Sequence, residues 1–231
     1  MQPWQETALA KKQGELDKIP KEWRLSKDTL VEAKTRKVIA GSFIESLLDE
    51  KTLSITRMDP TEIVESTGNG SMPAYDVVEA FCKRAAYGHQ MSLNLLEVGF
   101  SVALERAREL DAYYKQHGKP VGPLHGLPIT LKDHFHVKGM ETCFAYVGWV
   151  GTFEGQIGTG KERVFRSELI EELVSLGAVV IGKLHRERPM LAVATYSCSS
   201  HFRLPSLRCF KVKFKKQRRD RVREASVHED M

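Results

Sequence analysis

The sequence has no apolar run long enough to cross a membrane, because such a span needs about 18–20 residues and every apolar stretch here is shorter. It also has few cysteines, and the four that are present (Cys82, Cys143, Cys198 and Cys209) form no C-x-x-C pair and no cluster. Reduced structural thiols are therefore expected rather than disulfides or a zinc site. The first residues lack the charged-then-apolar order of a signal peptide, so we expect a cytoplasmic protein.

Positive charge is concentrated near one end of the chain. The 231 residues carry a formal net charge of +5, but residues 1–202 have a net charge of −1 and residues 203–231 have one of +6. The body of the chain therefore gives no electrostatic reason to expect nucleic acid or anionic lipid as a partner. The basic stretch could act as a nuclear localisation or nucleic-acid-binding segment, or it could be a non-native C-terminal sequence. The loss of any apolar periodicity there favours the second interpretation.

The first half of the sequence predicts helices. Polar, lysine-rich segments with modest amphipathic spacing cover residues 2–18 and 27–39. Residues 59–62 (Asp-Pro-Thr-Glu) are typical of a helix start, with Asp as the cap, Pro at the first helical position and Glu at the third. Further helices are expected after Pro73 and over residues 95–116.

A glycine-rich segment follows at residues 118–160 and indicates turns and short strands, with a strand expected over residues 128–131. We expect a helix over residues 161–176 and a buried strand over residues 178–181. A helix, a glycine and an apolar strand in this order are typical of an α/β fold. The apolar side of that helix should consist of Val164, Phe165, Leu169, Leu173 and Leu176.

Lys132 follows a Gly/Pro-rich turn and a short apolar run, and it is the principal candidate for a catalytic residue. Burial among Ile129, Leu131 and Phe135 would favour the neutral amine, which can take a proton from a serine hydroxyl and so activate a nucleophile. The plain alternative is an exposed lysine at the end of a strand, paired with Asp133.

Several stretches of the sequence resemble one enzyme family. Residues 122–133 (GPLHGLPITLKD) resemble the lysine motif of the amidase signature family. Residues 79–90 (EAFCKRAAYGHQ), 103–111 (ALERARELD) and 146–155 (YVGWVGTFEG) resemble its fungal acetamidase branch. Residues 176–183 match the strand that follows in that family. The motifs occur in the family's order, so the resemblance is specific.

The resemblance implies hydrolysis of carbon–nitrogen bonds in small carboxamides, with no cofactor and no metal. In the family a nucleophilic serine is activated through a bridging serine with a cis peptide bond, and a lysine that matches Lys132 accepts the proton. The implied fold is an incomplete amidase signature fold of the α/β class: a helical N-terminal region followed by the first part of a mixed sheet flanked by helices. We accordingly divide the chain into a helical region (residues 1–70), a partial amidase domain (71–197) and a basic tail (198–231).

The sequence departs from the family pattern where the two serines belong. No Gly-Gly-Ser-Ser-like segment follows Lys132. Ser197, Ser199 and Ser200 form a cluster there, but no glycine adjoins them, and close backbone approach at an oxyanion site usually needs glycine. We therefore expect an N-terminal portion of a fungal-type amidase that is inactive as it stands. The alternative is a non-catalytic amidase-like protein that binds a protein or nucleic acid through its basic tail; the sequence does not predict an oligomeric state.

Two further patterns point to other chemistry, and we expect neither to be functional. Residues 155–161 fit the first seven positions of a P-loop, G-x-x-x-x-G-K, but the eighth is Glu162, which puts a carboxylate where a phosphate would arrive. His134 and His136 would face the same side of a strand as metal ligands, but a metal site needs three or four ligands and no partner set is evident.

Overall fold

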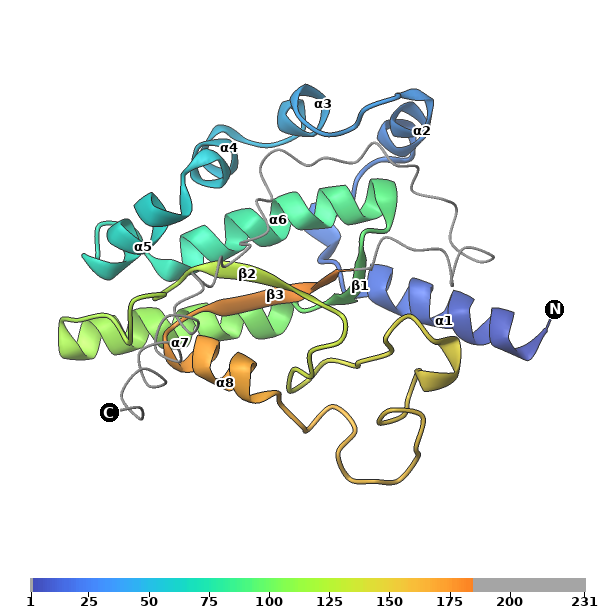
Figure 1. Cartoon of the computed structure of the whole chain (residues 1–231). Helices are drawn as coiled ribbons and strands as arrows, with labels where there is room; N and C mark the ends of the chain where they lie inside the picture. The colour runs from blue at the N-terminus through green and yellow to red at the C-terminus, as the bar shows by residue number, and fades with distance from the viewer. Residues whose placement is uncertain (1, 185–231) are drawn as a thin grey trace, which may run out of the picture.

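The computed structural model describes residues 2–184, which have a mixed α/β fold with helices around a small sheet (Figure 1). The sheet contains β1 (Leu95–Val98), β2 (Pro128–Lys132) and β3 (Val179–Leu184) in the order β1-β3-β2. The middle strand β3 is antiparallel to β1 and parallel to β2. The expected fold class, a helical region followed by the first strands of a mixed sheet, is confirmed.

Helices make up most of the described chain, and none of those in residues 2–184 is both long and apolar enough to span a bilayer. Figure 1 shows α2 to α5 along the outer side of α6, away from the sheet. In chain order the helices and 3₁₀ turns are α1 (Pro3–Asp17), η1 (Lys21–Trp23), α2 (Lys27–Thr35), α3 (Ser42–Ser46), α4 (Glu50–Arg57), α5 (Pro60–Gly68), α6 (Ala74–Ser92), α7 (Phe100–His117), η2 (Val147–Trp149) and α8 (Glu168–Ser175).

The side chains of β3 alternate between two packed layers. Val179 and Ile181 belong to the main core, which is formed largely by α6 and α7. Val180 packs instead with Ile170 of α8. Because successive strand residues point to opposite faces, α6 and α7 cover one face of the sheet and α8 covers the other. β3 is therefore buried on both sides, which explains the apolar run from Val179 to Ile181.

The helix start expected at residues 59–62 is confirmed. Asp59 accepts a hydrogen bond from the Thr61 amide at 2.9 Å, and Glu62 accepts one from the Asp59 amide at 2.7 Å, which together cap α5. The helix expected over residues 27–39 is shorter, because Arg36 turns to an extended backbone and ends α2.

The helix that follows Pro73, α6, is capped by a side chain from another helix. Asp111 of α7 accepts hydrogen bonds from the Ala74 and Tyr75 amides at 2.7 and 3.0 Å. A carboxylate at this position satisfies unpaired amides and complements the positive end of the helix dipole. The cap fixes α6 against α7, the pair on which one face of the sheet packs.

The single helix predicted over residues 95–116 is wrong at its start. Residues 95–98 form β1, and α7 begins only at Phe100. The cause is tertiary: β1 pairs with β3, more than eighty residues further along the chain. Gly99 sits between strand and helix, and its amide donates to the carbonyl of Ile181 at 3.1 Å.

The helix predicted over residues 161–176 is confirmed only for its second half, α8. Arg163 has a left-handed backbone with φ of 56°, which a helix cannot contain. The predicted apolar side is confirmed only in part. Leu173 packs against the buried cluster around Ile170, whereas Val164, Phe165 and Leu169 are 61%, 44% and 44% exposed.

The cysteines of the described chain, Cys82 and Cys143, are buried and form no disulfide. Burial raises the pKa of both thiols, that of Cys143 to about 12. A thiol that stays protonated is a poor nucleophile and a poor metal ligand. Cys198 and Cys209 lie outside the described residues.

His89 gives the fold a predicted sensitivity to acid. Its side chain is buried, and Nδ1 accepts a hydrogen bond from the Leu95 amide at 3.1 Å, which joins the end of α6 to the start of β1. Burial lowers the pKa of His89 from 6.5 to about 4. Between these two values the unfolded chain takes up a proton that the folded chain does not, so lowering the pH favours unfolding.

Urea titrations should therefore show a loss of about 2 kcal/mol in the free energy of unfolding between about pH 7.5 and about pH 5. His89→Gln, whose amide oxygen can accept the same hydrogen bond without titrating, should lose this part of the pH dependence and keep the part that comes from His125, whose pKa burial also lowers. An unchanged pH dependence in His89→Gln would assign the effect to other groups.

Candidate functional site

Lys132 lies at the last position of β2, and its side chain is exposed. Its neighbour Leu131 is buried with Val180 and Ile170 beneath α8. Because successive residues of a strand point to opposite faces, the burial of Leu131 does not extend to Lys132. The expectation that flanking apolar residues bury this lysine is therefore wrong for the described chain.

The buried lysine of this region is Lys183 in β3, which is 0% exposed. Its ammonium lies 2.9 Å from Asp133 Oδ1, donates to Thr142 Oγ1 at 2.8 Å and donates to the carbonyl oxygen of Glu141. The ammonium therefore makes two hydrogen bonds and one ion pair, and these contacts hold the chain from Asp133 to Thr142 against β3. Lys183 was not among the predicted site residues, although a lysine inside an apolar strand signals a buried partner.

A second group of buried charges joins α1 to the sheet and to the same loop. Lys11 of α1 lies 2.7 Å from Glu15 and 2.8 Å from Glu141, and it also donates to Glu97 of β1. Glu15 additionally accepts a hydrogen bond from the Val98 amide at 2.7 Å. One lysine thus connects the N-terminal helix, the first strand and the loop that follows β2.

The pKa values of this group show how far the charges compensate one another. Burial would lower the pKa of Lys11, but the carboxylates of Glu97 and Glu15 raise it above its usual range. Burial would raise the pKa of Glu15 and of Glu141, but Lys11 holds both below their usual value. For Glu97 burial prevails, and its pKa is raised despite the adjacent ammonium.

Three buried groups in this network are close enough to suggest a metal site. Donor atoms of Glu97, Glu141 and Cys143 all lie within 4.8 Å of one another. However, the Lys11 ammonium already contacts both carboxylates, and burial keeps the Cys143 thiol protonated. Metal ligands must be deprotonated and free of competing cations, so this arrangement does not fit a metal.

The loop that matches the start of a P-loop is closed by its own glutamate. Glu162 Oε1 accepts hydrogen bonds from the Thr159 amide at 2.8 Å and from Thr159 Oγ1 at 3.1 Å. Backbone amides of Glu162, Thr159 and Gly160 lower the pKa of this carboxyl. The Glu162 carboxylate is therefore already bound by the amides of its own loop.

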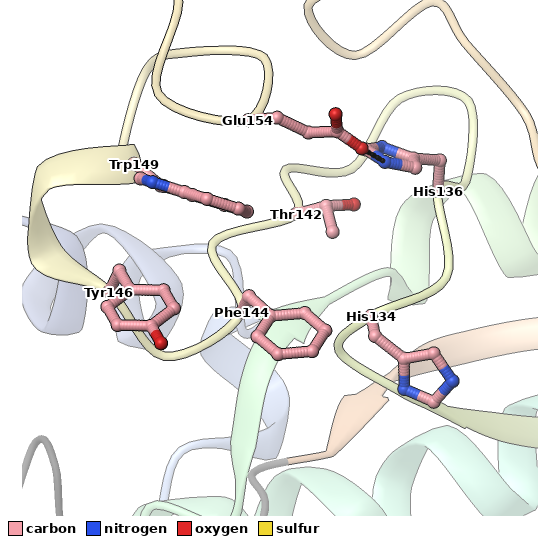
Figure 2. Close-up of a pocket in the computed structure, with 7 residues that line it drawn as sticks. All are labelled: His134, His136, Thr142, Phe144, Tyr146, Trp149 and Glu154. Atoms are coloured by element: carbon pink, nitrogen blue, oxygen red, sulfur yellow. Dashed lines mark hydrogen bonds and ion pairs between the residues drawn. The ribbon is translucent and has the colours of Figure 1, made fainter.

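A cavity of about 410 Å³ lies beyond the strand that ends at Lys132 (Figure 2). Figure 2 shows Phe144 and Tyr146 on one side of it and His136 and Glu154 on the other, with Trp149 reaching in between. We refer to this cavity as the aromatic cup. Its lining consists of His134, His136, Thr142, Phe144, Tyr146, Trp149 and Glu154.

Both histidines that suggested a metal site line the aromatic cup. His136 Nε2 lies 3.2 Å from the Glu154 carboxylate, and its ring stacks on Phe153 with centroids 4.8 Å apart. The ring of His134 lies 4.0 Å from that of Phe135. Within residues 2–184, neither histidine belongs to a group of three metal-ligating side chains.

The backbone around the aromatic cup is strained. Phe144, Ala145 and Glu154 have φ values of 52°, 64° and 52°, in the left-handed region that side chains other than glycine rarely adopt. Each such residue costs roughly 1–3 kcal/mol and persists only where surrounding contacts enforce it. The turn is closed by the Tyr146 amide, which donates to the Cys143 carbonyl at 2.8 Å. It leaves the Phe144 and Tyr146 rings 42% and 46% exposed.

The remaining predicted features lie outside the described residues. They are the serine cluster Ser197, Ser199 and Ser200, and the basic stretch of residues 203–231. The structure therefore places Lys132, His134, His136 and Glu162, and says nothing of the serines or the tail.

Comparison with known proteins identifies one family that the chain matches. Residues 76–202 match the family described as Amidase. An acetamidase from Aspergillus oryzae is 44% identical over 154 residues, which are 64% of this chain and 26% of that protein. An acetamidase from Emericella nidulans is 36% identical over 157 residues, which are 66% and 27% of the two chains. The chain thus spans about a quarter of the length of these relatives.

A solved structure shows the same fold. Fatty acid amide hydrolase superposes with a TM-score of 0.69 at 27% sequence identity, over 80% of this chain and 32% of that one. The described residues therefore have the fold of one part of that enzyme, as expected for an incomplete amidase signature fold.

The buried pair of Lys183 and Asp133 leads to a stability prediction. Lys183→Met should destabilise the chain by about 3–5 kcal/mol, because it leaves the Asp133 carboxylate buried without its cation. The double variant Lys183→Met/Asp133→Leu should recover at least about half of that loss, since no lone buried charge remains. Urea unfolding of the single and double variants measures the coupling.

Lys119→Met, at an exposed lysine, is the control and should change stability by less than about 0.5 kcal/mol. If the stability loss of the double variant equalled the sum of the losses in Lys183→Met and Asp133→Leu, the two charges would not be coupled.

Proposed function

The chain belongs to the amidase family, and from this membership we propose that it carries the lysine part of an amidase site, with Lys132 as the base. The activity that membership favours is hydrolysis of the carbon–nitrogen bond of small carboxamides. The observation that carries the proposal is the match over residues 76–202, which contains the whole of β2 and the unbroken GLPITLKD sequence that ends at Asp133.

The position of Lys132 in the fold supports a catalytic role. β2 is parallel to β3, and ligands of α/β sheets bind beyond the carboxyl ends of parallel strands. Lys132 is at that end of β2, with an exposed side chain. The next residue, Asp133, is fixed by Lys183. The backbone at the site is therefore held firmly while the amine of Lys132 stays accessible to a reacting group.

The family's chemistry assigns a proton transfer to this amine. The lysine accepts a proton through a bridging serine from a nucleophilic serine, which attacks the amide carbonyl and releases ammonia or an amine. Only a neutral amine can accept that proton, and desolvation favours the neutral form. Because Lys132 is exposed in the described chain, a further covering group, either polypeptide or bound substrate, is required for this step.

We infer further that these 231 residues do not complete the reaction by themselves. The sequence contains no Gly-Gly-Ser-Ser-like run, and it spans about a quarter of the length of the acetamidases it resembles. A lysine base without a positioned nucleophile has nothing to activate, so ammonia release from acetamide should not exceed the background rate.

A chimeric enzyme separates the role of Lys132 from the activity of the isolated chain. The segment of the Aspergillus oryzae acetamidase that aligns with this chain is replaced by this chain's own residues. The chimera should release ammonia from acetamide, and Lys132→Met should lower its kcat by at least about 10³-fold, as loss of a base in a nucleophilic triad does.

Lys138→Met, at another exposed lysine six residues further on, is the matched control and should retain near-full activity. A Lys132→Met chimera within tenfold of the parent would remove Lys132 from the mechanism. If the isolated chain released ammonia and Lys132→Met abolished that release, the chain would be active by itself and Lys132 would remain assigned as the base.

A further inference from the structure

The aromatic cup is an open pocket whose aromatic wall is formed by rings in contact with one another. The ring centroids of Tyr146 and Trp149 are 5.4 Å apart, and those of Phe144 and Trp149 are 6.2 Å apart. Phe144 and Tyr146 are nearly parallel, with an interplanar angle of 8°. The left-handed backbone at Phe144 and Ala145 holds the Phe144 and Tyr146 rings toward solvent. Three aromatic rings therefore surround one accessible space (Figure 2).

The charges that line the aromatic cup favour a cation. The faces of aromatic rings carry negative electrostatic potential and attract ammonium groups. Glu154 adds a carboxylate with a 56% exposed side chain. Among residues 2–184, no lysine or arginine lines the cup. An anion would meet no positive partner there except a protonated histidine, whereas an ammonium group would meet three rings and a carboxylate.

We propose that the aromatic cup binds an organic ammonium group, with its alkyl carbons against Phe144, Tyr146 and Trp149 and its charge shared with Glu154. A quaternary or alkylated ammonium fits better than a bare ammonium ion, because its charge is spread over carbon atoms that also bury apolar surface. This binding site goes beyond amide hydrolysis and does not require Lys132 or the family's serines.

The test uses the complete chain and two ligands of the same shape. Choline carries a trimethylammonium group, and 3,3-dimethylbutan-1-ol is its neutral counterpart with carbon in place of nitrogen. Isothermal titration calorimetry should detect choline binding in the millimolar range and at least roughly tenfold weaker binding of the neutral alcohol. Saturable quenching of tryptophan fluorescence should follow the choline isotherm and should be lost in Trp149→Leu.

Variants connect the binding to the aromatic cup. Trp149→Leu should weaken choline at least about fivefold, and Glu154→Gln about threefold, with little change for the neutral alcohol. Tyr113→Leu is the matched control, because Tyr113 is an aromatic residue of α7 that pairs with His117 and does not line the cup. It should leave choline affinity unchanged.

Far-ultraviolet circular dichroism identifies any variant that fails to fold, and Glu154→Gln then carries the test, because the Glu154 side chain is exposed and its loss perturbs no core packing. Equal affinity for choline and the neutral alcohol would overturn the proposal, since the cup would then recognise shape alone. Absence of choline binding to the folded chain, or tighter binding of benzamide than of choline, would overturn it as well.

Discussion

The Lys183 ammonium is buried in the middle strand of the sheet, where water cannot solvate it. Oxygen atoms from one loop solvate it instead. The Thr142 hydroxyl and the Glu141 carbonyl accept hydrogen bonds from the ammonium, and the Asp133 carboxylate forms an ion pair with it. A buried ammonium without such partners would be strongly destabilising, so the loop between Asp133 and Thr142 can take only conformations that supply them. This requirement positions the end of β2 and the loop residues His134, His136 and Thr142 that line the aromatic cup.

The network around Lys11 extends the same constraint to the N-terminal helix. Lys11 binds Glu141, the residue whose carbonyl accepts from Lys183, and it also binds Glu97 in β1. Both carboxylates are buried and contact the Lys11 ammonium. Pairing outweighs burial for Glu141, whose pKa is lowered, and burial outweighs pairing for Glu97, whose pKa is raised. Lys11 and Lys183, from distant parts of the chain, thus both contact the loop that follows β2. α1 thereby helps to position the candidate site.

Features set by local sequence could be predicted, and features set by distant partners could not. The cap of α5 and the buried strand β3 follow from short motifs and apolar runs. The motif around Lys132 identified the family. In contrast, residues 95–98 form a strand only because β3 pairs with them, and the segment before α8 is not helical because Arg163 adopts a left-handed backbone. The exposure of Lys132 could not be read from its neighbours, because the faces of the sheet decide it. The apolar residues before Lys183 do signal a buried partner, but they do not identify that partner as Asp133.

Amidase chemistry at Lys132 and ammonium binding in the aromatic cup both presuppose that Lys183 fixes the loop between them. Hydrogen–deuterium exchange with mass spectrometry, comparing the parent chain with Lys183→Met, tests this most directly. The account predicts that exchange in residues 128–143 becomes at least about tenfold faster while α4 and α5 keep their rates. Unchanged exchange in residues 128–143, or an equal acceleration throughout the chain, would contradict it.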